Sequence, residues 1–468
     1  MKLLIALVAC VIIFCFSALN WRRTVKAVFF LLVIEGALRK WIVPQASEMI
    51  YFLKEIVLLG AYFNFYGFSA TDRRLIPKGK IINFLIFIAI GWCVFQVFNP
   101  SLGSPFVGIF GLRAYLLYIP LIWMLAALFQ SEDELYKFLR SHLLLTIPVG
   151  LIGVVQFLSP ASSFINKYSN EEAQAVVTFG VNAIVRITGT FSYISGYGIY
   201  LIVCFGLLIP MLSVKQPQVW RLLSIIELFL VSVNSLMTGS RGTVFAEVLF
   251  VAFYFGIKGF TNPESVLRLI KQLILPVLIV TIAATIWFRP AINAFWLRTT
   301  SYRDVSGRVS LSFLEPFDFI QYKQLDGYGT GATHQAAPLL RRVLDLQAGE
   351  PIPVPFEAEM GRIALELGPI GFLFWYSMRV GIIIGLLYTS WKLKRPFLQN
   401  LAITAFLIQA IQINGFLVFA PTFAVYYWFL SSWIFLLPQL EQIENWQREQ
   451  QLLQEDALSS YFSNSPYR

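Results

Sequence analysis

The sequence predicts an all-α fold, a polytopic integral membrane protein with about 12–13 transmembrane helices. Of its 468 residues, 57% are hydrophobic and only 13% are charged, and the mean hydropathy is +0.68. Soluble domains carry about 25% charged residues, so this composition excludes an ordinary soluble enzyme. Apolar runs long enough to cross a bilayer recur from residue 3 to residue 437.

The individual spans follow from these runs, since a helix needs about 20 mainly apolar residues to cross the hydrocarbon core. We expect spans centred on residues 3–19, 25–43, 48–66, 81–98, 107–129, 137–158, 191–213, 219–237, 242–257, 270–288, 362–388, 399–419 and 421–437. Lys and Arg in short loops favour the cytoplasmic side. With the N-terminus outside, 17 of them fall in inner loops and only four in outer ones, namely Arg39, Lys40, Arg113 and Arg241.

This topology places two long segments on the outer face, about 159–190 and about 289–360, within a membrane domain that covers residues 1–438. The second segment is too long for a simple connector, and long ordered loops are usually functional. Residues 439–468 form a polar cytoplasmic tail. Within it we expect an exposed amphipathic helix over 440–456.

Composition also limits the function classes. The net charge of +10 does not indicate nucleic-acid binding, because the basic residues lie in short clusters between apolar runs. The chain has two histidines and four cysteines without metal-ligand spacing, so we expect no metal site. It has no Walker motif either, and we expect no cofactor.

Two arginines at the outer ends of spans are candidate anion ligands. Arg186 precedes the seventh span, and Arg241 lies in the Thr238–Gly242 turn between the eighth and ninth. A guanidinium beside the N–H groups of a helix start suits a phosphate or diphosphate. The alternative is that each arginine anchors a helix end in the headgroup layer.

The large outer loop and the span after it hold the other candidates. Arg308 and His334 flank a glycine-rich stretch, Gly327–Gly331, and His334 is either a surface residue or a base. Glu357 and Glu359 precede the eleventh span, where Glu359, Arg362 and Glu366 share one helix face. This face indicates either an intrahelical ion pair or a carboxylate that accepts a proton from a hydroxyl nucleophile.

Four motifs occur in one order: Arg-x-x-Gly-Thr-Phe at 186–191, Thr-Gly-Ser-Arg-Gly at 238–242, Gly-Tyr-Gly-Thr-Gly at 327–331 and Glu-Leu-Gly-Pro-Ile-Gly at 366–371. In this order they resemble the O-antigen ligase/polymerase superfamily, the Wzy- and WaaL-like membrane glycosyltransferases. The resemblance covers about 180–380 by motif and the whole chain by hydropathy. The segment Glu35–Trp41 also looks like a feature of polysaccharide polymerases.

The resemblance implies a multi-pass protein of the bacterial inner (plasma) membrane whose active face, with the large loop, is periplasmic. It implies a metal-independent, inverting transfer in which a glycan leaves undecaprenyl diphosphate for a sugar hydroxyl. Arg186, Arg241 and Arg308 would then bind the lipid diphosphate. Where ligases carry a histidine before the Glu-Leu-Gly motif, this chain has Glu357, so the base is Glu357, Glu359 or a displaced His334.

Because of this departure we expect a polymerase of exopolysaccharide or O-antigen repeat units, with other polysaccharide-export proteins as further candidate partners. The alternatives are a ligase that transfers glycan to a lipid or protein, a transporter or flippase of lipid-linked glycans, and a scaffold. A transporter would place charged residues near mid-membrane on broken helices, within an internally repeated sequence, and no repeat is visible.

Overall fold

The computed structural model describes residues 2–69, 72, 79–169, 178–179, 184–214, 216–261, 304–323 and 325–463, with isolated positions between 263 and 296. The described chain is helical except for turns, irregular loops and one antiparallel hairpin. In it β1 (Thr178–Phe179) pairs with β2 (Ile184–Val185), with Thr178 opposite Val185. The predicted all-α fold is therefore confirmed for the described residues.

The N-terminal helices are α1 (Lys2–Ser17), α2 (Trp21–Ala37), α3 (Ser47–Tyr62), α5 (Lys80–Gln96), α6 (Pro105–Leu116), α7 (Leu121–Ala126), α8 (Glu132–Leu144) and α9 (Thr146–Leu158). The C-terminal helices are α10 (Ile194–Ser213), α11 (Gln218–Met237), α12 (Arg241–Thr261), α15 (Asp304–Lys323), α16 (Ala337–Val343), α17 (Glu359–Lys392), α18 (Pro396–Ile411) and α19 (Pro421–Ser463). Two π-helical turns, η1 (Leu38–Ile42) and η3 (Phe63–Phe68), extend α2 and α3, and η2 (Pro44–Ala46), η4 (Pro100–Leu102) and η5 (Phe164–Asn166) are 3₁₀ turns.

Within the described residues, seven helical segments are long and apolar enough to cross a membrane: Pro105–Ala126, Glu132–Leu158, Ile194–Ser213, Gln218–Met237, Arg241–Phe260, Glu359–Lys392 and Pro421–Glu455. Three shorter apolar helices accompany them, Leu7–Ser17, Lys80–Gln96 and Pro396–Ile411. The chain is accordingly a membrane protein with many helices. The expected span at 270–288 lies largely outside the described residues.

Several expected spans differ from the observed helices for local reasons. The span expected at 107–129 is confirmed as Pro105–Ala126, but it consists of two helices, α6 and α7, because Pro120 between them supplies no N–H. The span expected at 399–419 ends at Ile411, and an irregular stretch leads to α19. α17 is kinked at Gly368, whose φ of 68° precedes Pro369. The helix expected over 440–456 is a continuation of α19.

The centre of the bundle is formed by α10 and the first half of α19. Nearly every residue of α10 is buried, and α19 contributes the enclosed side chains of Trp428 and Trp433. By contrast, α5, α11 and α12 expose large apolar side chains such as Phe84, Leu222 and Phe245, as helices that face lipid do. Helices that are apolar all round thus lie inside, and those with an exposed apolar side lie outside.

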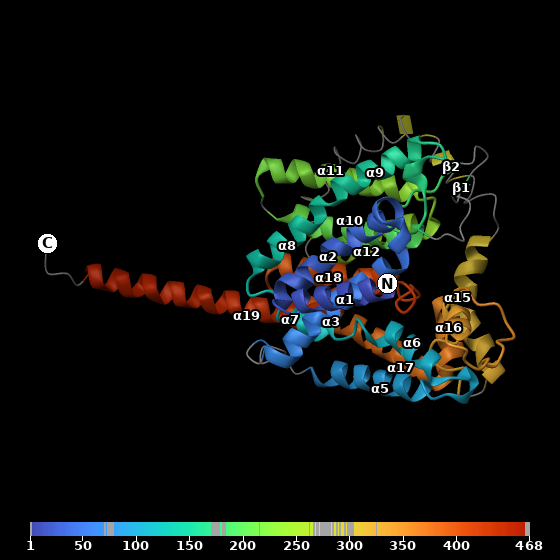
Figure 1. The fold of residues 1–468 in the computed structure, drawn as a ribbon. Helices are drawn as coiled ribbons and strands as arrows, with labels where there is room; N and C mark the ends of the chain where they lie inside the picture. The colour runs from blue at the N-terminus through green and yellow to red at the C-terminus, as the bar shows by residue number, and fades with distance from the viewer. Residues whose placement is uncertain are drawn as a thin grey trace.

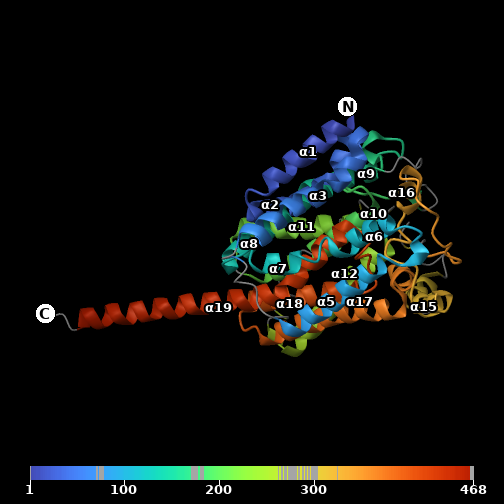
Figure 2. The same ribbon diagram turned by 60° about the horizontal axis from the view of Figure 1, so that its bottom comes forward.

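The bundle has two distinct ends. The hairpin of β1 and β2 gathers at one end with α15 and α16, while α19 projects far beyond the opposite end (Figure 1). The same separation is visible after rotation (Figure 2). We call these the loop end and the tail end. The loop end brings together β2, α15, α16 and the first residues of α12 and α17.

Candidate polar site at the loop end

The two predicted arginines lie beside the same turn. Arg186 follows β2, and its Nε donates a hydrogen bond to the carbonyl oxygen of Thr238 at 2.9 Å. Arg241 is the first residue of α12, three positions further along that turn. Gly239 takes a φ of 60°, a conformation that favours glycine. Both arginines are half-buried, so the structure brings them together next to a helix N-terminus.

The turn is rigidly built. The Ser240 hydroxyl accepts from the backbone N–H of Thr243 at 3.4 Å and so caps α12, while Ser240 N–H donates to the Thr238 hydroxyl at 3.1 Å. Thr243 lies against Gly198 of α10, where an added Cβ would approach its hydroxyl to 2.5 Å. The α12 N-terminus therefore has a fixed position, with its dipole and N–H groups at the loop end.

The early motif Glu35–Trp41 packs directly against the Arg186 motif. Lys40 donates to the hydroxyl of Thr188 at 2.9 Å and to the carbonyl of Gly189 at 2.7 Å. Gly36 makes the closest approach, because a Cβ there would lie 2.3 Å from Ser192 N. Two motifs about 150 positions apart in the sequence thus form one wall of the site.

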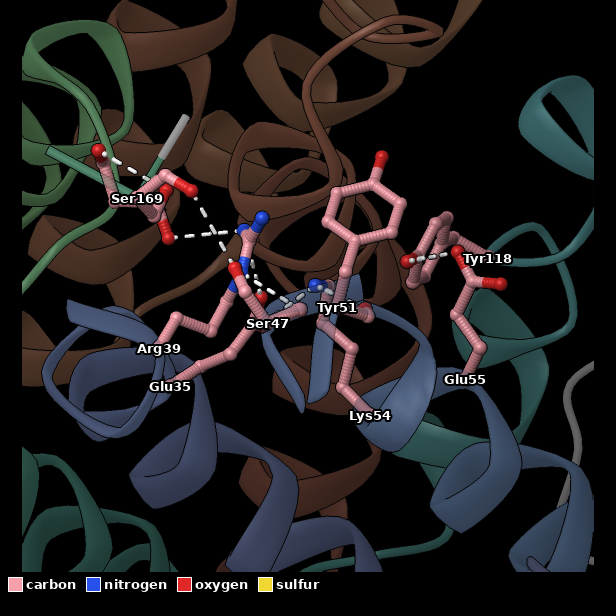
Figure 3. A network of polar contacts seen from close by, with 9 residues as sticks. Glu35, Arg39, Ser47, Tyr51, Lys54, Glu55, Tyr118 and Ser169 are labelled. Carbon is pink, nitrogen blue, oxygen red and sulfur yellow. Dashed lines mark hydrogen bonds and ion pairs between the residues drawn. The ribbon is translucent and has the colours of Figure 1, made fainter. Parts of the chain in front are cut away.

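A network of charges and rings continues from this wall (Figure 3). Arg39 donates to the Ser192 hydroxyl at 3.0 Å and stacks over the Tyr51 ring at 5.2 Å. Lys54 forms an ion pair with Glu35 at 2.5 Å. Its Nζ also lies over the Tyr51 ring, 4.8 Å from the ring centre. Two cations therefore lie within 5.2 Å of the centre of the Tyr51 ring.

The network reaches the next helix through Phe52. The rings of Tyr51 and Phe52 lie 5.2 Å apart, and Arg113 of α6 stacks over Phe52 at 5.1 Å. Arg113 also forms an ion pair with Glu55, which accepts a hydrogen bond from Tyr118 at 3.2 Å. Arg113 lies 4.8 Å from the Phe110 ring, which in turn contacts the ring of His334.

The glycine-rich stretch is a loop locked between α6 and α17. Gly327, Gly329 and Gly331 all have positive φ, between 66° and 90°. The N–H groups of Tyr328 and Gly329 donate to the carbonyls of Leu365 and Glu366, at 2.7 and 2.9 Å. This docking places the loop against the kink of α17, so two sequence motifs interlock backbone to backbone.

His334 ends this loop and is held by its neighbour Thr333. Glu366 accepts from the Thr333 N–H at 2.8 Å and from its hydroxyl at 2.7 Å, and its other oxygen accepts from Tyr115 at 2.8 Å. Arg362 donates to the Thr333 carbonyl at 2.8 Å and stacks over the Phe419 ring at 3.4 Å. The buried Glu366 therefore fixes the loop rather than facing solvent.

The surroundings of His334 keep its imidazole neutral. Burial lowers its pKa to about 4, and the nearby charges of Arg113 and Arg362 act in the same direction. Its Nδ1 accepts a hydrogen bond from the Ala336 N–H at 3.1 Å. Burial is the main cause of this shift, so the imidazole stays neutral near neutral pH and can accept a proton only as a weak base.

The three predicted carboxyl and histidine candidates have different environments. Glu357 is exposed, whereas Glu359 is fully buried, pairs with Arg379 at 3.3 Å and accepts from the Val418 N–H at 2.9 Å. Glu315 of α15 lies near Glu357, and its pKa is raised by burial and by that neighbouring carboxylate. Only Glu357 and His334 are accessible enough to meet an incoming hydroxyl.

Arg308 lies in α15, but its side chain is outside the described residues. Arg113, Tyr115 and Glu315 contribute to this end of the molecule although no sequence motif contains them. Arg113 had a signal, since it is one of only four basic residues in the expected short outer loops. Tyr115 and Glu315 had none, because their partners are distant in the chain.

The fold is that of a helical membrane protein, with a cluster of polar and charged side chains at its loop end. In comparisons with known proteins, no family model and no curated protein matched the chain. The geometry at the loop end therefore supplies the argument for function.

Proposed function

We propose that this chain is a membrane glycosyltransferase that polymerises undecaprenyl-diphosphate-linked oligosaccharide repeat units on the periplasmic face of the bacterial inner membrane. The observation that carries the proposal is the hydrogen bond from Arg186 to the Thr238 carbonyl, which puts Arg186 and Arg241 beside one helix start. Arginine forks and helix N-termini are the groups that bind diphosphates.

Charge supports an anionic substrate at this end. Arg362 donates to the carbonyl and hydroxyl oxygens of Thr333, which carry no charge. A guanidinium stays protonated, so a neutral acceptor leaves its positive charge in place. In a partly dry site, such a charge stabilises the negative charge that develops on a departing diphosphate.

The proposed reaction is a direct displacement at the anomeric carbon. An acceptor sugar hydroxyl forms the new C–O bond, and the bond from that carbon to the diphosphate oxygen breaks with its electron pair going to the leaving group. The hydroxyl proton passes to Glu357 or to the neutral His334, which are the accessible acceptors. Arg186 and Arg241 hold the diphosphate as it gains charge.

The test is the size profile of surface glycan in a deletion strain complemented with wild type, Arg241→Ala or Arg241→Lys. We expect Arg241→Ala protein to insert at wild-type levels while long chains disappear and single repeat units remain. Arg241→Lys should restore little, because a point charge does not replace a bidentate fork. Full restoration by Lys would contradict the diphosphate clamp.

The lipid-linked pool, measured in the same cells, separates the alternatives. Long chains retained on the lipid carrier would indicate a ligase. A normal profile with Arg241→Ala, together with loss on deletion, would indicate transport or scaffolding instead. Glu357→Gln and His334→Ala compared in this assay identify the proton acceptor, and wild-type chain lengths in both would exclude the two candidates together.

A further inference from the structure

A second, chemically different cleft opens at the loop end. Its volume is about 600 Å³, and it lies where the end of α5 and η4 face the last turn of α15. Its lining includes two rings, Phe95 and Phe98, and three charged side chains, Lys323, Asp326 and Glu350. None of these residues contributes to the arginine site.

The walls of the cleft are tied together before any ligand binds. The side-chain amides of Gln96 and Asn99 donate to the carbonyl of Asp326, at 2.6 and 3.0 Å. The Glu350 N–H donates to the Ser101 carbonyl at 2.8 Å, and Lys323 pairs with the Glu350 carboxylate. The cleft is therefore preformed, and a ligand would not have to order it.

Its chemistry combines ring faces with acceptor oxygens. Phe95 is 65% exposed and Phe98 is 70% exposed. The Asp326 carboxylate has no hydrogen-bond or ion-pair partner among the described residues. A sugar presents both matching surfaces, C–H groups on its ring face and hydroxyl donors on its rim. An acyl chain would instead leave the charged wall desolvated without partners.

The net charge of the cleft determines whether it favours charged or uncharged sugars. Lys323 and Glu350 compensate each other, so Asp326 leaves the cleft with one net negative charge. This charge disfavours uronic acids and phosphate groups. The cleft therefore differs in sign from the arginine site, which favours an anion.

The cleft is also connected to the proposed reaction centre. Asp326 is the residue that begins the loop of Gly327–Gly331, and the same loop ends at Thr333 and His334. We propose that this cleft is a glycan subsite that holds uncharged sugar residues of the acceptor chain, with Phe98 as the stacking platform and Asp326 as the hydroxyl acceptor. This inference rests on the proposed glycan transfer and adds a second binding region to it.

The test is binding of fluorescently labelled oligosaccharides, prepared by hydrolysing the surface polysaccharide of the producing strain, to purified full-length protein in nanodiscs. We expect Phe98→Ala and Asp326→Asn each to weaken binding at least about tenfold. The matched control is Phe106→Ala, because Phe106 is 61% exposed at the start of α6 but lies outside the cleft lining. It should bind as wild type does.

Three results would overturn the subsite: no binding by the wild type, unchanged affinity in both cleft variants, or displacement of the probe by added phospholipid. A fraction of the same hydrolysate rich in uronic acids should bind more weakly than the neutral fraction, and the reverse order would contradict the charge argument. Arg241→Ala separates the two claims. Retained oligosaccharide binding with normal polymerisation in that variant would remove the diphosphate clamp but leave the subsite.

Discussion

The two ends of the bundle differ in the groups that accept hydrogen bonds from some of their cationic side chains. At the tail end, cations meet carboxylates across helices: Arg140 pairs with Glu227, Arg395 with Glu132, Lys26 with Glu134 and Arg22 with Asp72. At the loop end, Lys54 pairs with Glu35 and Arg113 with Glu55, but Arg186 also donates to the Thr238 carbonyl and Arg362 to the Thr333 carbonyl. An ion pair neutralises both of its charges, whereas a carbonyl acceptor fixes a guanidinium without removing its charge.

The largest expected effect concerns stability at the tail end. Arg140 and Glu227 are both buried, so Arg140→Met leaves an uncompensated carboxylate and should cost about 3–5 kcal/mol of unfolding free energy. The double variant Arg140→Met with Glu227→Leu should recover most of it. Denaturant unfolding in detergent measures both, and equal losses in the single and double variants would show that the pair is not the cause.

The corresponding change at the loop end should affect activity instead. Arg186→Ala removes the guanidinium that donates to the Thr238 carbonyl beside the start of α12, and we expect the rate of polymer formation to fall about 100-fold. The unfolding free energy should change by less than about 1 kcal/mol. If the loss of activity is accompanied by an equal loss of folded protein, Arg186 acts on stability, as Arg140 does at the tail end, and not on activity.

The sequence was sufficient for the all-α membrane fold, because hydropathy is a local signal. Gly239, Gly327, Gly329 and Gly331 occupy positive φ positions, as tight turns in such motifs require. The number of spans was less predictable. α18 ends at Ile411, inside the span expected at 399–419, and hydropathy does not register such a break. Contacts such as Tyr115 with Glu366, 251 positions apart, leave no pattern in a single sequence.

A smaller effect is expected where the glycine loop meets α17. Gly368 has a φ of 68°, and a Cβ there would lie 2.3 Å from the carbonyl oxygen of Leu325. Gly368→Ala should therefore cost about 1–3 kcal/mol in thermal or chemical unfolding. Gly91→Ala is the control, because no atom lies within 4 Å of its Cβ position, and it should be neutral or stabilising. Equal changes in unfolding free energy for the two substitutions would contradict the close backbone contact between the Gly327–Gly331 loop and α17.

The smallest expected effect is the titration of His334. Its pKa of about 4 lies below the ordinary value of 6.5, so the unfolded chain binds a proton that the folded chain does not. Its contribution to stability is complete above about pH 6.5 and falls as the pH drops toward 4. Carbon-13 NMR of labelled histidine measures this, since the chain has only two histidines and His334→Gln assigns the signal. A pKa between 6 and 7 would show that the His334 imidazole is not held neutral by burial.

The most direct test of the central claim is binding of undecaprenyl diphosphate to the purified protein. Wild type, Arg241→Lys and the exposed-tail control Arg448→Lys should be compared in one titration. We expect Arg241→Lys to weaken binding at least about tenfold and Arg448→Lys to leave it unchanged. Equal affinity in all three proteins would contradict a diphosphate site at the Thr238–Gly242 turn.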